Sequence, residues 1–101
     1  MQSVENLLEE VKEAVLPFVT NKEGHVFLER ALKEIQGDIK SIKEEIKDGS
    51  ISVPQSEILI DMLHDSAKAV MLAAEGMDEI EVEKAINTAL DLIKQGVTRL
   101  I

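Results

Sequence analysis

A row of apolar residues at spacings of four and three is the feature that most constrains what this chain can fold into. The row consists of Leu28, Leu32, Ile35, Ile39, Ile42 and Ile46. Such spacing places every member on one narrow stripe of an α-helix, where other helices can cover it. The pattern therefore predicts a long amphipathic helix that ends near Lys47, before the stop signal Asp48-Gly49-Ser50.

Three further helices are predicted from start signals. Ser3 is the expected N-cap of a short first helix, which Pro17 ends or kinks because proline lacks an amide hydrogen. Capping-box patterns at 20–23, 52–55 and 78–81 predict the starts of the second, third and fourth helices. The third helix is expected to run to about Ala74.

The loops between these predicted helices are short, and short loops favour antiparallel neighbours. The predicted fold is therefore all-α: a four-helix up-and-down bundle with a short first helix. We expect residues 1–101 to form a single domain, since a chain of this length suits one core.

The third predicted helix carries apolar residues around nearly all of its circumference, from Ile58 to Ala74. A helix that is apolar all round is expected to be buried all round, and one small bundle leaves each helix a wet face. We therefore expect a homodimer, or another protein partner, on this helix. The candidate interface residues are Ile60, His64, Ala67 and Met71. In the alternative, the helix is the central element, wrapped by the Pro17 region and by the linker at Ile51 and Val53.

The composition excludes several classes of partner and site. A net charge of −9 disfavours nucleic acid and anionic membrane surfaces, which bind through clustered Lys and Arg. The absence of cysteine excludes disulfides and thiolate chemistry and is consistent with the cytoplasm. No apolar run approaches about 18 residues, so no membrane span is expected, and the N-terminal residues do not resemble a signal peptide.

His64 is the residue that most invites a chemical interpretation. Asp61 precedes it by three residues, the spacing at which metal-binding bundles present a carboxylate and an imidazole together. A metal site formed by Glu57, Asp61 and His64 is one alternative. The sequence lacks a second such pair, so we instead expect no metal or other cofactor, and a histidine hydrogen-bonded to Asp61.

Two stretches resemble known families. The segment 85–97, AINTALDLIKQGV, resembles the C-terminal helix of a small archaeal all-helical family of unknown function, and Asp65, Ala67 and Lys68 sit near that family's S-D-A-K step. This resemblance covers about a third of the chain and implies a fold but no activity. Thr20, Asn21 and His25 resemble the start of a long helix in the helical domain of tRNA-modifying GTPases, whose GTPase domain and terminal cysteine motif are absent here.

No phosphate-binding glycine loop or serine nucleophile motif is present in the sequence. The sequence therefore favours a non-enzymatic role, as a small acidic helical protein that self-associates or binds a protein partner. The alternative of a different class is a metal-binding bundle, with a metal-assisted hydrolase as its enzymatic form.

Overall fold

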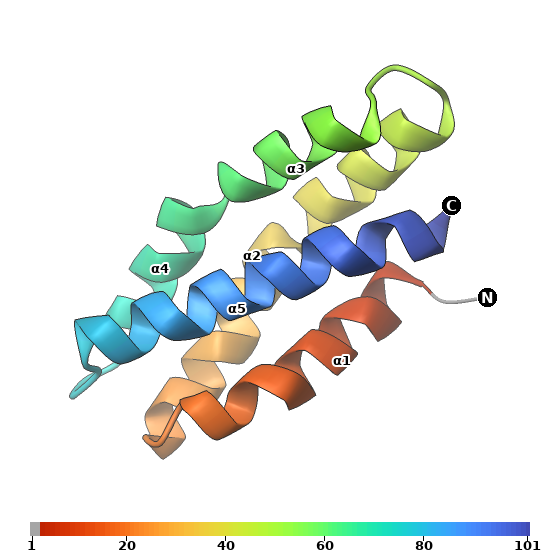
Figure 1. Cartoon of the computed structure of the whole chain (residues 1–101). Helices are drawn as coiled ribbons and strands as arrows, with labels where there is room; N and C mark the ends of the chain where they lie inside the picture. Colours follow the sequence, from red (N-terminus) through yellow and green to blue (C-terminus); the bar gives the residue numbers. More distant parts are fainter. Residues whose placement is uncertain (1–2) are drawn as a thin grey trace.

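The computed structural model describes residues 3–101. The elements, in chain order, are α1 (Val4–Val15), η1 (Leu16–Phe18), α2 (Lys22–Lys47), α3 (Val53–Asp61), α4 (His64–Leu72), α5 (Glu79–Val97) and η2 (Thr98–Leu100). The predicted all-α, four-helix up-and-down arrangement is confirmed, with α3 and α4 together in the third position (Figure 1).

The long helix α2 has the predicted face inward. All members of the apolar row are buried except Ile46, which is partly buried. The helix starts one residue later than the predicted capping box: Asn21 is the N-cap, and its side chain accepts a hydrogen bond from the Glu23 amide at 2.8 Å. Thr20 instead donates its amide hydrogen to Glu81 Oε1 at 2.8 Å, which ties the loop before α2 to α5.

Gly49 ends α2 in a Schellman motif. Its φ of +84° lies in the left-handed region, which glycine adopts without a Cβ clash. The Gly49 amide donates to the Ile46 carbonyl, and the Ser50 amide donates to the Glu45 carbonyl. The chain then reverses and begins α3 in the capping box predicted between Ser52 and Gln55.

The prediction of one unbroken third helix is wrong. The segment divides into α3 and α4 at Met62 and Leu63, where the Leu63 amide bonds to the Ile60 carbonyl three residues back. No proline or glycine marks the break. Within one chain the segment is not buried all round, because Ile58 and Met62 are exposed, and the expectation that a partner covers this surface stays a prediction.

The first and last helices lie side by side and complete the bundle. The N-cap at Ser3 is confirmed, and Pro17 lies in the short turn η1. Asp78 caps α5 by accepting from the Ile80 amide at 2.8 Å. Leu90 belongs to the buried face of α5, whereas Leu92 is only partly buried.

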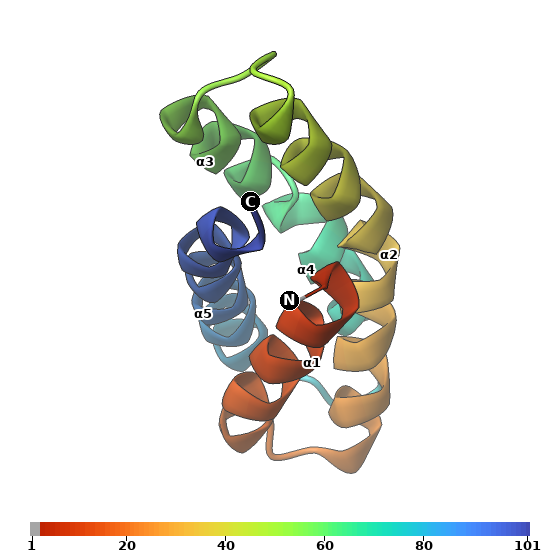
Figure 2. The same cartoon turned by 90° about the vertical axis from the view of Figure 1, so that its right-hand side faces the viewer.

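The helices form a ring around one aliphatic core (Figure 2). α1 packs against α2 and α5, and the α3–α4 pair packs between α2 and α5 on the other side. Gly96 allows α5 to approach α1 closely, since a Cβ there would collide with Leu7. The resulting bundle measures 43 × 25 × 17 Å, and none of the helices in residues 3–101 has the length and apolar character needed to span a membrane.

Candidate functional site

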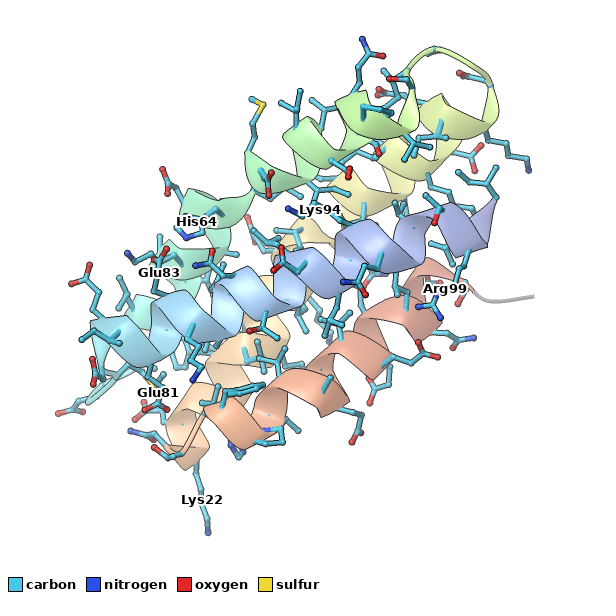
Figure 3. All side chains as sticks on the ribbon, in the orientation of Figure 1. Lys22, His64, Glu81, Glu83, Lys94 and Arg99 are labelled. Atoms are coloured by element: carbon cyan, nitrogen blue, oxygen red, sulfur yellow. The ribbon has the colours of Figure 1, made fainter. Side chains whose placement is uncertain are left out.

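His64 begins α4 and joins two helices through its ring. Its Nδ1 lies 2.8 Å from Asp65 Oδ1, and its Nε2 lies 2.7 Å from Glu83 Oε1 on α5 (Figure 3). Only 24% of the side chain is exposed. When both nitrogens carry a proton, the ring can donate a hydrogen bond to each carboxylate, so both nitrogens have a partner.

The Glu83 carboxylate is the centre of this polar cluster. Lys68 Nζ forms an ion pair with Glu83 Oε2 at 2.8 Å. Asn87 donates its side-chain amide to Glu83 Oε1 at 3.3 Å, and Lys68 also pairs with Glu79 at 3.3 Å. The cluster borders a shallow groove between α4 and α5 of about 700 Å³.

These contacts shift two pKa values in opposite directions. The hydrogen bond to Asp65, supported by Glu83, raises the pKa of His64, although partial burial opposes the shift. The Lys68 ammonium, with a further contribution from His64, lowers the pKa of Glu83 against the effect of desolvation. The arrangement thus favours a charged histidine beside an ionised carboxylate, and it links α4 to α5.

The hydrogen bond predicted between Asp61 and His64 is not made. Asp61 pairs instead with Lys94 of α5, whose Nζ lies 2.8 Å from Asp61 Oδ1. Glu57, Asp61 and His64 do not form a cluster, and across residues 3–101 no three His, Cys, Asp or Glu side chains gather in a way that could hold a metal ion. The residues of the metal alternative therefore do not fit a metal site.

The candidate interface residues are also placed differently from the prediction. Ile60, Ala67 and Met71 are buried in the core of a single chain, so they offer no surface to a partner. His64 is the one member that reaches the surface, and it is held in the polar cluster. The interface residues predicted from the sequence therefore lie mostly on the face of this segment that turns inward.

The exposed apolar surface of this segment lies on the side of the helix that faces away from the core residue Ile60. Ile58 is 63% exposed and Met62 is 71% exposed, while Leu59 and Leu63 beside them are partly buried. We call these four residues the apolar strip. The strip consists of two pairs of residues that are four positions apart in the sequence, a spacing that places each pair on one side of a helix. The sequence alone does not show that this side faces solvent, which follows only from the inward packing of Ile60.

Three of the four residues of the apolar strip form one side of a groove between α2 and the α3–α4 pair. Leu59, Met62 and Leu63 line the groove from one side, and Ile42 lies at its base. The other side of the groove is a row of three residues on α2, which we call the acidic wall: Asp38, Ser41 and Glu45. Two of the three carry a carboxylate.

The comparisons with known proteins do not identify the chain. No protein-family model matches it, and neither the curated proteins nor the solved structures that were compared include a match. The two family resemblances therefore stay predictions, and the geometry of the chain carries the functional argument.

Proposed function

We propose that the chain is a non-enzymatic protein-interaction module and that the apolar strip, at the end of α3 and the break before α4, is its binding face. One observation carries the proposal: Ile58 and Met62, one helical turn apart, expose most of their surface beside an apolar groove. Full burial of one such side chain contributes about 1.5–3 kcal/mol. A partner that covers both side chains gains the part of this burial energy that each still lacks, without any change in the fold.

A contiguous apolar patch is a better indication of binding than a single exposed side chain. Ile80 is even more exposed, at 79%, but its neighbours along the α4–α5 groove are chiefly charged and polar. Single exposed apolar residues are normal on soluble proteins. Ile80 therefore serves as the matched control for the apolar strip.

The polar cluster supports a structural role for His64. Its two ring nitrogens are engaged by Asp65 and Glu83, which leaves neither nitrogen available as a base, nucleophile or metal ligand in this arrangement.

We propose that the protein acts in the cytoplasm, because its sequence has no cysteine and so gains nothing from an oxidising compartment.

The occupant we favour is a different protein, with a second copy of the chain as the competing occupant. Each copy carries a net charge of −9 and an acidic wall beside its apolar strip. A symmetric dimer through the strip would bring these like charges together, and like charges that face each other across an interface oppose association.

Photocrosslinking in the source cells tests this function. A photoreactive amino acid replaces Met62 in one variant and Ile80 in the other, and mass spectrometry identifies the adducts. The proposal predicts a specific protein adduct at position 62 that is lost when Ile58→Asp is added, and little or none at position 80. Equal adducts at the two positions, or none at position 62, would overturn it. An adduct with a second copy would keep the interaction module but assign its occupant to self-association.

A further inference from the structure

The groove beside the apolar strip has an asymmetric charge distribution that specifies the chemistry of its occupant. Along the second half of α2 and its C-cap, the positions 33, 36, 40, 43 and 47 carry Lys, Gln, Lys, Lys and Lys, and the positions 34, 38, 41, 45 and 48 carry Glu, Asp, Ser, Glu and Asp. Members of each set are three or four residues apart, so each set follows one flank of the helix. The two flanks lie on either side of the buried apolar row.

The structure shows which flank faces which neighbour. Lys33 and Gln36 line a hollow shared with α1, and Lys40 pairs with Glu5 of α1 at 3.3 Å. Asp38 and Glu45 line the groove shared with α3 and α4. The basic flank of α2 thus faces α1, and the acidic flank faces the apolar strip.

A second acidic row borders the strip on its other side. Glu57 and Asp61 lie one turn apart on the flank of α3 that faces α5, as the contact between Asp61 and Lys94 shows. Asp61 is neutralised by Lys94, but within residues 3–101 no salt bridge engages Asp38, Glu45 or Glu57. The apolar strip therefore lies between the acidic wall, whose two carboxylates are unpaired among residues 3–101, and a second row in which Glu57 is unpaired and Asp61 is not.

From this arrangement we infer that the groove between α2 and the α3–α4 pair binds a basic amphipathic helix of a partner protein. The inference rests on the proposed interaction function and adds the chemistry of the partner. An α-helix can place an apolar stripe on Met62 and the adjacent Ile58 and direct Lys or Arg to the acidic wall on one side and to Glu57 on the other, because helical neighbours are offset by about 100°. In a β-strand the residues next to an apolar side chain point away from the surface, so they cannot reach either set of carboxylates.

The size of the groove sets the length of the contact. From Asp38 to Glu45 the acidic wall spans seven residues of α2, which corresponds to about 10 Å along the helix axis. This length matches about two turns of a partner helix. A peptide of about 14 residues is therefore long enough to cover the groove and to cap both of its ends.

The experiment uses the full chain and three labelled 14-residue peptides in a fluorescence-anisotropy titration. The first peptide has leucines on one helical face and lysines on the other, the second has the same composition in scrambled order, and the third replaces every lysine with glutamate. The inference predicts that the first binds much more tightly than the other two and that added salt weakens its binding.

Charge variants separate the groove from the overall negative charge of the protein. Replacing Asp38→Asn together with Glu45→Gln should weaken binding of the first peptide about 3- to 30-fold, which corresponds to losing two exposed ion pairs. The control pair Glu10→Gln and Glu13→Gln removes the same charge from the exposed side of α1 and should change affinity less than about twofold. All four side chains lie on helix surfaces outside the core cluster, and a thermal melt checks that each variant folds.

Each outcome of the experiment decides the matter. Equal weakening by the two charge variants, or equal binding of the ordered and scrambled peptides, would show a diffuse electrostatic attraction and overturn the inference. Binding of the glutamate peptide as tight as that of the lysine peptide would also overturn it. A light-scattering mass of two chains that falls to one in the Ile58→Asp variant would assign the groove to a second copy. In each of these cases the crosslinking result at position 62 still decides the interaction function separately.

Discussion

Gly37→Ala is expected to stabilise the fold, although it changes a residue near the middle of the longest helix. Glycine within a helix loses more backbone entropy on folding than alanine does, and the difference is about 0.5–1 kcal/mol. Gly37 is exposed, its φ is not positive, and a Cβ built on it meets no atom within 4 Å. The open space around Gly37 shows that this glycine does not mark a close helix crossing.

The expected gain can be measured by thermal denaturation. For a domain of this size, 1 kcal/mol shifts Tm by about 4–8 °C, so the Gly37→Ala variant should melt about 2–8 °C higher than the natural chain. Urea denaturation should give the same sign with an unchanged slope against denaturant, because the surface exposed on unfolding stays the same.

Gly49→Ala is the matched control, since it makes the same chemical change in similarly open surroundings. The φ of Gly49 is +84°, and a Cβ there also meets no atom within 4 Å. An alanine must adopt the left-handed conformation at a cost of about 1–2 kcal/mol, so this variant should melt lower than the natural chain. A lower Tm for Gly37→Ala as well would refute the reasoning, because it would show that the backbone at Gly37 needs glycine.

Further substitutions test the core and the polar cluster. Ile39→Ala removes a fully buried side chain and should cost about 2–5 kcal/mol in urea denaturation, whereas Glu44→Ala on the exposed face should change little. Ile60→Glu should unfold the chain, as judged by circular dichroism, because it buries a charge; a folded variant would contradict the placement of Ile60 in the core. His64→Gln should make the change of Tm with pH smaller. Because the pKa of His64 is raised in the folded chain, protonation of its ring stabilises the fold. This stabilisation is complete below the ordinary pKa of 6.5 and is lost as the pH rises through the raised pKa. The Tm of the natural chain should therefore exceed that of the variant most below pH 6.5. An equal difference in Tm at pH 5.5 and pH 8.5 would contradict this assignment.

The main architecture could be predicted from the sequence because local signals and apolar spacing agreed. The apolar row of α2, the N-cap at Ser3 and the capping box at Ser52 each depend on residues within a few positions of one another. Such local patterns can be read without knowing the tertiary contacts. The stop at Gly49 belongs to the same class.

The details that escaped prediction depend on contacts between distant residues. Thr20 and Glu81 bond across 61 positions, which moves the start of α2 to Asn21 and leaves Asp78 to cap α5 without Glu81. His64 finds Glu83 on another helix, whereas the sequence offered Asp61 one turn away. Tertiary packing decided each of these cases against a plausible local partner.

The exposed apolar strip was missed for a related reason. Apolar residues occur all around the segment from Ile58 to Ala74, so periodicity gives no preferred face. The bundle buries the side that contains Ile60, Ala67 and Met71, and the break at Met62 divides the segment where the sequence has no helix-breaking residue. The exposed side then follows as what the core leaves uncovered.

A single fluorescent label tests most directly whether the apolar strip is the binding face. Because the chain has no cysteine, Met62→Cys and Ile80→Cys each provide one site for a polarity-sensitive fluorophore on a strongly exposed position. Adding the lysine and leucine peptide, or the partner identified by crosslinking, should shift the emission at position 62 to shorter wavelength as water is excluded, and should leave position 80 unchanged. A shift at position 80 with none at position 62 would contradict the assignment of the strip as the binding face.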